Sequence, residues 1–390
     1  MPHQRSLPAF AALALALLVM IGATAPSAHA QSHGNDGAQH ISIMDAETGL
    51  LLYCDECEVP MQPASMSKLM TVLVVAEHLA AGDITMDTMF TVSENAWRHG
   101  AVSDGSHMFL ELGSEVSVRN LLAGIAIVSA NDACIVLAEG IAGSEAAFVL
   151  EMNQRAQELG FTTARFRNAT GLPDPDHVIS SADLARLADL LIVRYPEIYA
   201  DYHEPSFTYN GHTQQNRDPL LGAFPGADGV KTGHTNAAGY GLIGSAVLEG
   251  RRRIIVFNGT NSMAERRSEA QRLMNAAFHD FTAQRLYNAG DEVGAADVWL
   301  GGRDTVPLLT QSEIAVGGPR SVQAGLEASI VFQGPLHAPI AEGDEVAELV
   351  IEGPGFETKR FPLVAGARVG RANPFARAWT GLMLTFGAQP

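Results

Sequence analysis

The stretch Pro63-Ala-Ser-Met-Ser-Lys-Leu-Met-Thr71 opens an apolar segment whose spacing is typical of a helix. The apolar pattern runs to about Ala81 and stops before Gly82, so the sequence predicts a buried helix over this range. Residues three apart lie on one side of a helix, and the Lys68 amine can therefore reach the Ser65 hydroxyl. The helix N-terminus adds partial positive charge there. This pair indicates a serine nucleophile with a lysine as its base.

A Ser-x-x-Lys pair is common by chance, but two further short motifs follow it. Ser129-Ala-Asn131 lies in a loop between two helical patterns. Ser129 can relay a proton between Lys68 and a leaving amine, and the Asn131 amide can hold Lys68 or the substrate backbone. The third motif is Lys231-Thr-Gly233, in a strand-like segment. Three such motifs in this order favour catalysis over coincidence.

The Lys231-Thr232-Gly233 motif has the character of a substrate-binding strand. Lys231 supplies positive charge for a terminal carboxylate, and Gly233 lets substrate approach without a side chain in the way. An oxyanion needs two converging N–H donors. The backbone N–H groups of Ser65 and His234 are the natural pair.

The surrounding sequence carries a wider resemblance, in the strings DAETGLLLYC (45–54), PASMSKLMT (63–71), SANDAC (129–134), RNATGLPDPDHVISSADLARLA (167–188), YNGHTQQNRDPLL (209–221) and GVKTGHTNAAGYGLIGSA (229–246). Over roughly residues 39–285 they resemble the D-alanyl-D-alanine carboxypeptidases, the low-molecular-mass penicillin-binding proteins of the bacterial periplasm. The resemblance implies removal of the terminal D-alanine from peptidoglycan pentapeptides through a serine ester. It also implies slow acylation by penicillins, so stem peptides and β-lactams are the expected partners.

The family's functional residues can be carried over by position. The nucleophile falls on Ser65, the proton acceptor on Lys68, the second active serine on Ser129 and the carboxylate-binding lysine on Lys231. Arg217 matches a basic residue that helps to position the substrate carboxylate. One departure is Ala130, because the middle motif of the family usually reads Ser-Gly-Asn.

The order of predicted elements is a strand pair, several helices, further strands and a helix from Met263 to Arg285. This order predicts a mixed sheet with helices on its faces, an α/β or α+β architecture. With the resemblance, residues 31–288 form a penicillin-binding/β-lactamase-like catalytic domain. Short apolar runs then predict a small all-β domain over 289–371, which is a β-sandwich in the family.

The two ends of the chain point to export and to a membrane surface. Arg5, the apolar run 7–25 and the small residues Ala28 and Ala30 are typical of a signal peptide at 1–30, with an uncleaved anchor as the alternative. Residues 372–390 predict an amphipathic helix whose apolar face is Phe375, Trp379, Leu382, Met383 and Phe386.

The charge distribution narrows the partners further. The whole chain has a formal net charge of −18, which argues against nucleic-acid binding through the bulk field. After Glu357, however, the chain carries five basic residues and no acid. This local reversal favours a tail that binds a membrane surface. The resemblance implies that this surface is the outer face of the inner membrane, on the periplasmic side. The alternative is a helix that docks back onto the β-domain.

The three cysteines do not make a disulfide scaffold. Cys54 and Cys57 could close as a small disulfide or serve as a metal or redox pair. A metal site is disfavoured because zinc would need two further ligands and the sequence has no second CxxC, and neither metal nor cofactor is expected. Cys134 is expected to pack as a small apolar residue.

Other readings remain. A class A β-lactamase relies on a glutamate in an E-x-x-L-N loop, and Glu197 and Glu204 lack the following Leu-Asn. A D,D-endopeptidase is chemically close but usually lacks the extra β-domain. A wall-binding protein with a dead site should show an eroded motif, and none is eroded. His177, in a polar loop, and Arg251–Arg253, at a hairpin turn, are expected to be solvated.

Overall fold

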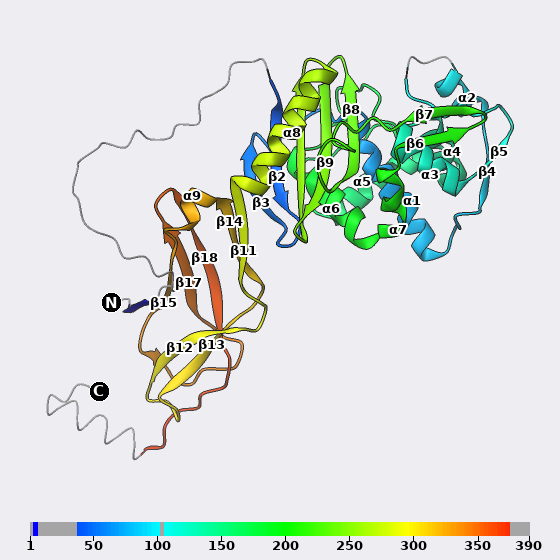
Figure 1. Cartoon of the computed structure of the whole chain (residues 1–390). Coiled ribbons are helices and arrows are strands. Elements are labelled where there is room, and N and C mark those ends of the chain that lie inside the picture. The colour runs from blue at the N-terminus through cyan, green and yellow to red at the C-terminus, as the bar shows by residue number, and fades with distance from the viewer. Residues whose placement is uncertain (1–2, 7–36, 102–104, 375–390) are drawn as a thin grey trace, which may run out of the picture. The chain divides into compact units, whose positions relative to one another are not determined.

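The computed structural model describes residues 3–6, 37–101 and 105–374 (Figure 1). They divide into a unit within 31–282 and a second unit that combines 283–374 with 3–6. Most of the expected signal peptide, and the expected anchor helix from Phe375 onward, lie outside the described residues.

The first unit is built on a five-stranded sheet in the order β3-β2-β10-β9-β8. Every pairing in this sheet is antiparallel, so the expectation of a mixed sheet was wrong. The reason is local, because tight turns join β2 to β3 and β8 to β9 to β10, and such turns reverse the chain. The strands are β2 (Gln39–Asp45), β3 (Leu50–Asp55), β8 (Ala227–Thr235), β9 (Gly239–Leu248) and β10 (Arg251–Thr260).

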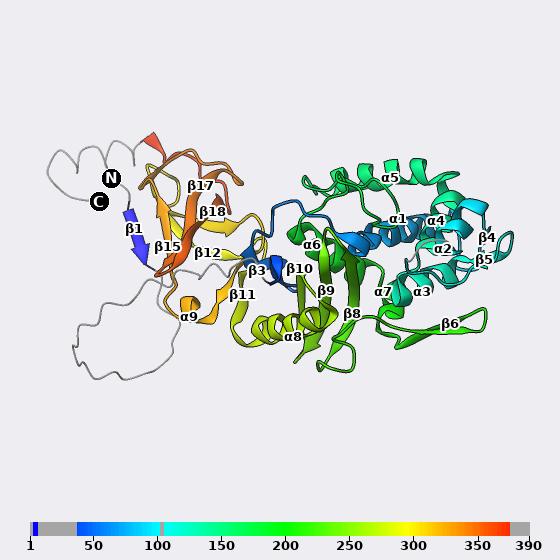
Figure 2. The ribbon, with the colours of Figure 1, turned by 90° about the horizontal axis from the view of Figure 1, so that it is seen from above.

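Helices cover both faces of this sheet, with α8 on one side and α1, α5 and α6 on the other (Figure 2). The long helices are α1 (Lys68–Ala81), α3 (Val118–Val128), α4 (Asn131–Ala142), α5 (Glu145–Glu158), α6 (Ser181–Arg194) and α8 (Met263–His279). Short elements complete the unit: η1 (Ala64–Ser67), β4 (Met89–Thr91), α2 (Glu94–Ala101), β5 (Glu115–Ser117), α7 (Pro196–Tyr199), η2 (Ala200–His203), β6 (Ser206–Tyr209) and β7 (His212–Gln215).

The central helix begins and ends as the apolar pattern predicts. A 3₁₀ turn, η1, carries Ser65 and runs directly into α1, and Gly82 ends α1 in the left-handed conformation with φ of 80°. Glycine adopts this conformation without a steric penalty. By length and composition Ala64–Ala81 could cross a membrane, but most of it is buried inside the unit. It is therefore a core helix.

Two expectations about the end of this unit were wrong. The helix from Met263 ends at His279, and β11 (Phe281–Tyr287) follows. Phe281 and Ala283 are buried, with Thr282 less so between them, and this alternation is typical of a strand.

Arg253 is not solvated at a hairpin turn. It lies within β10, is 1% exposed and forms an ion pair with the buried Asp45.

The second unit is all-β apart from one helical turn, α9 (Arg320–Gln323). Its main sheet has the order β1-β15-β17-β18-β13-β12-β16, and β11 pairs with β14 beside it. The short apolar runs expected over 289–371 form strands. The strands are β1 (His3–Ser6), β12 (Glu292–Trp299), β13 (Thr305–Thr310), β14 (Ile314–Pro319), β15 (Glu327–Phe332), β16 (Leu336–His337), β17 (Glu345–Gly353) and β18 (Phe356–Ala365).

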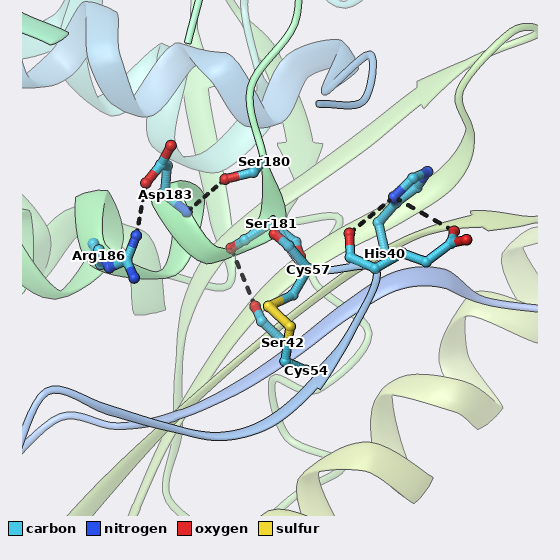
Figure 3. The surroundings of a disulfide bond; sticks show 9 residues. His40, Ser42, Cys54, Cys57, Ser180, Ser181, Asp183 and Arg186 are labelled. Atoms are coloured by element: carbon cyan, nitrogen blue, oxygen red, sulfur yellow. Dashed lines mark hydrogen bonds and ion pairs between the residues drawn. A yellow bond between two sulfur atoms is a disulfide. The ribbon is translucent and has the colours of Figure 1, made fainter. Parts of the chain in front are cut away.

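Cys54 and Cys57 form a disulfide at the end of β3 (Figure 3). The carbonyl of Cys57 accepts hydrogen bonds from the Ala182 N–H at 2.9 Å and from the Ser181 hydroxyl at 3.2 Å. These bonds tie the segment that leads to Ser65 to the start of α6. The disulfide therefore closes a small loop whose inner end is anchored in the core, and neither cysteine is available for a metal.

We expect the double change Cys54→Ser and Cys57→Ala to lower the free energy of unfolding by about 2 kcal/mol. A cross-link over so few residues removes little entropy from the unfolded chain. Urea titration of the oxidised protein measures the difference, and the wild type in reducing buffer is the control. Equal stability of all three samples would contradict the expectation.

Candidate active site

The Lys68 amine lies at the centre of the three motifs. Its Nζ is 2.8 Å from Ser65 Oγ and 2.7 Å from Asn131 Oδ1, and it also donates to the main-chain carbonyl of Thr170. Lys68 itself is fully buried. Three segments that are distant in sequence thus meet at one nitrogen: the turn η1, the start of α4 and the loop after α5.

The identity of these partners decides what the amine can do. The Thr170 carbonyl and the Asn131 Oδ1 are acceptors only, so they take two N–H groups of Lys68. A neutral amine has no further hydrogen, and its lone pair then faces Ser65 Oγ. In that state the Ser65 hydroxyl donates to Lys68, which is the arrangement of a nucleophile with its base.

Burial also prepares the charge state of this lysine. Desolvation lowers the pKa of Lys68 to about 8, with a smaller lowering from Arg217, while Cys134 and Asp132 act in the opposite direction. At this pKa a substantial fraction of the amine is neutral near pH 8. An exposed lysine would be almost wholly protonated at the same pH.

Ser129 and Asn131 come from the short connection between α3 and α4. Ser129 caps α3 in the left-handed conformation with φ of 63°, which is uncommon for a residue with a side chain. Its hydroxyl is buried and has no hydrogen-bond partner among the described residues. The Asn131 N–H donates to the Ser106 carbonyl at 2.8 Å, which anchors the connection to the loop before β5.

The Lys231-Thr-Gly233 motif lies in β8, beside the turn that carries Ser65. A Cβ on Gly233 would stand 2.8 Å from the Pro63 carbonyl oxygen, so the strand packs directly on the residues before the nucleophile. The missing side chain at Gly233 thus serves this packing. Lys231 is 2% exposed, and desolvation, followed by the charge of Lys68, holds its pKa well below the usual range.

Arg217 and His234 lie on more open parts of the same region, whereas Thr232 is buried like its neighbours in the motif. Arg217, which follows the β6–β7 hairpin, is exposed and donates to Ser106 Oγ. This contact joins Arg217 to the loop that also holds Asn131. His234 is exposed at the end of β8, where its ring stacks on Tyr240 with centroids 3.8 Å apart. Thr232, between Lys231 and Gly233, is 8% exposed.

The sequence did not predict two features of the loop that follows α5, namely its contact with Lys68 and the burial of His177. The carbonyl of Thr170 was not foreseen, because any residue carries such a group. His177 was expected to be solvated, but it is 2% exposed and its Nδ1 accepts the Arg167 N–H at 3.2 Å. Burial lowers the pKa of His177 to about 4, so its ring stays neutral at ordinary pH.

The described residues offer little else that resembles a centre of chemistry. Cavities of about 270 Å³ beside His78 and about 340 Å³ beside Asp189 contain none of the motif residues. Within 37–101 and 105–374, no group of three histidine, cysteine or acidic side chains could hold a metal ion. The arrangement around Lys68 is therefore the candidate active site.

Comparisons with known proteins identify the family of this chain. Residues 26–261 match the family described as D-alanyl-D-alanine carboxypeptidase, and residues 281–371 match the penicillin-binding protein 5 C-terminal domain. The D-alanyl-D-alanine carboxypeptidase DacD of Escherichia coli is 37% identical over 339 residues, which cover 86% of this chain and 87% of that protein.

Solved structures give the same result. Penicillin-binding protein 5 from Haemophilus influenzae has a TM-score of 0.76 at 33% identity, over 90% of this chain and all of that chain. Penicillin-binding protein D2 from Listeria monocytogenes, in its ampicillin-bound form, has a TM-score of 0.56 at 29% identity, over 64% of this chain and all of that one. The chain belongs to the D-alanyl-D-alanine carboxypeptidase family of serine peptidases, with a C-terminal domain of the penicillin-binding protein 5 type.

Proposed function

We propose that this enzyme removes the terminal D-alanine from peptidoglycan pentapeptides through an ester on Ser65. The observation that carries the proposal is the set of contacts around Lys68, which leaves the lone pair of the neutral amine facing Ser65 Oγ. Lys68 takes the hydroxyl proton as Oγ attacks the carbonyl carbon of the scissile bond. The N–H groups of Ser65 and His234 stabilise the resulting oxyanion.

The remaining residues act on the leaving D-alanine. Its carboxylate binds Lys231, Thr232 and Arg217, since two of these groups are cationic. The proton that Lys68 received passes through Ser129 to the amine nitrogen, the C–N bond breaks and D-alanine leaves. Water then attacks the ester carbonyl and Lys68 accepts a proton from it. The acyl C–O bond breaks, Lys68 returns the proton to Ser65 Oγ, and the shortened peptide leaves as its carboxylate. The Ser129 hydroxyl supports this relay, because it has no hydrogen-bond partner among the described residues and can bond to substrate.

A penicillin enters the same sequence but stops after acylation. Its β-lactam amide replaces the scissile peptide bond, and its carboxylate replaces that of D-alanine. The leaving nitrogen stays tethered to the acyl group after the ring opens. Support comes from the relative from Listeria monocytogenes, for which ampicillin-bound and cefotaxime-bound forms are known.

The first test is an intact-mass time course with benzylpenicillin, on the wild type and on Ser65→Ala. We expect a single adduct that persists for minutes on the wild type and is absent from the variant. The wild type should also release D-alanine from a pentapeptide, with no release by the variant. Rapid loss of penicillin without a lasting adduct would favour a β-lactamase, and no reaction at all would favour a binding protein with a dead site.

The second test is the pH dependence of acylation. Because Lys68 must be neutral to act as a base and its pKa is lowered to about 8, the acylation rate should rise about tenfold per pH unit below pH 8 and level off above it. Stopped-flow measurements with a fluorescent penicillin give this profile. Lys68→Arg should be inactive throughout, since its guanidinium stays protonated. A flat profile for the wild type would rule out Lys68 as the base.

We also propose that the protein is exported to the periplasm and held on the outer face of the inner membrane by its C-terminal tail. The support is in the sequence: a typical signal peptide at 1–30, and basic residues with an aromatic stripe near the C-terminus. The tail lies outside the described residues, apart from Asn373 and Pro374.

Deletion of residues 373–390 should release the protein from membranes into the soluble periplasmic fraction. The apolar face of the tail supplies the binding energy, so Trp379→Glu in the full chain should weaken attachment in the same direction. Cell fractionation and immunoblotting measure the distribution, with penicillin acylation as the control for folding. A truncated protein that still sediments with membranes would contradict the anchor.

A further inference from the structure

One side chain organises the loop that supplies the Thr170 carbonyl. Asn168 Oδ1 accepts hydrogen bonds from the N–H groups of Thr170 (3.1 Å), Gly171 (2.7 Å) and Leu172 (3.1 Å) and from the Thr170 hydroxyl (2.9 Å). Its Nδ2 donates to the Leu172 carbonyl at 3.0 Å. Four donors at one oxygen also settle the orientation of this amide. The conformation of residues 170–172 is thus set by Asn168.

The loop has no room to move toward the nucleophile. Gly171 has φ of +78°, and a Cβ there would stand 2.1 Å from the Ala64 carbonyl oxygen and 2.7 Å from Ser67 Oγ. The loop backbone therefore touches the turn η1 on either side of Ser65. The position of the loop must therefore satisfy both this contact and the bond to Lys68.

Other bonds hold the flanks of the loop but leave its centre to Asn168. The Ala169 N–H donates to Glu145 Oε1 at 2.9 Å, and the Thr71 hydroxyl donates to the Ala169 carbonyl at 2.7 Å. Two further side chains bond the main chain of residues 170–172: Thr170 Oγ1 accepts the Leu172 N–H at 3.2 Å, and Lys68 donates to the Thr170 carbonyl. Within the described part of the protein, no side chain other than these two and Asn168 does so.

We propose that Asn168 is a positioning residue for acylation: it holds the Thr170 carbonyl against Lys68 Nζ and so keeps the amine lone pair directed at Ser65. The inference rests on the proposed roles of Ser65 and Lys68. With the carbonyl in place, both N–H groups of the neutral amine are engaged. Without it, one N–H is released and the amine rotates about its terminal bond, so the lone pair faces Ser65 only part of the time.

The test compares Asn168→Ala with a matched control, Asn153→Ala. Like Asn168, Asn153 bonds main-chain groups through both ends of its side-chain amide. Its Oδ1 accepts the Phe166 N–H at 2.9 Å, and its Nδ2 donates to the carbonyls of Val149 and Phe166. It anchors the start of the same loop but bonds none of residues 170–172. Loss of general stability should therefore affect both variants, whereas misdirection of Lys68 should affect only Asn168→Ala.

Stopped-flow acylation by a fluorescent penicillin separates the dissociation constant of the first complex from the rate constant of ester formation. For Asn168→Ala we expect the rate constant to fall about tenfold or more, with the dissociation constant within about twofold of the wild type. For Asn153→Ala both constants should stay within about threefold. Equal losses in the two variants, or a normal rate constant in Asn168→Ala, would overturn the proposal.

Asn168→Asp supplies a readout that a purely structural role would not change. It keeps the accepting oxygen, so ester formation should recover at high pH, but its negative charge near Lys68 should raise the lysine pKa. The acidic limb of the pH profile should move upward by about half a pH unit or more. Titratable or charged groups already acting on Lys68 are Asp132, Cys134, His177, Arg217 and Lys231.

These outcomes separate the inference from the proposed function. A pH profile of Asn168→Asp identical to that of the wild type would overturn the inference. This variant decides the question even where Asn168→Ala does not fold. A wild-type protein that forms no adduct would contradict the proposed function instead, before any variant is compared.

Discussion

The contact between the Lys68 amine and its three oxygen partners is the constraint on which the rest of the site depends. Ser65 comes from the turn before α1, Asn131 from the start of α4, and Thr170 from the loop after α5. A buried amine needs such partners, because an unsatisfied polar group in the interior is costly. The helices of the first unit must therefore pack so that these segments meet at one point.

Burial serves two purposes in this arrangement. It lowers the pKa of Lys68, which supplies a neutral base. It also lowers the pKa of Lys231, which is buried in the same region. The charge of Lys68 also lowers the pKa of Lys231, so the two buried amines are not readily protonated together. An anionic group beside Lys231 favours the protonated form of that amine, so carboxylate binding by Lys231 fits a neutral Lys68.

The sequence predicted helices and strands best where they depend on the local spacing of apolar residues. The helix up to Ala81 and the strands of the second unit follow from apolar spacing, and their ends follow from glycines and caps. Prediction failed where burial depends on a distant partner. Arg253 is buried because Asp45, from another strand, lies opposite, and the His177 ring is buried where it packs edge-on against the Phe166 ring. The Thr170 carbonyl could not be predicted at all, since main-chain groups leave no mark in a sequence.

Ser129 concentrates two unfavourable features in one residue. A left-handed backbone at a non-glycine residue costs on the order of 1 kcal/mol, and a buried hydroxyl without a partner costs a similar amount. Neither cost is relieved locally, although a glycine at this position would remove both. The α3–α4 connection holds this conformation because the neighbouring Asn131 is fixed on both sides, by Ser106 and by Lys68. A hydroxyl held so firmly without a bond is prepared for a partner that arrives with the substrate, as a proton relay requires.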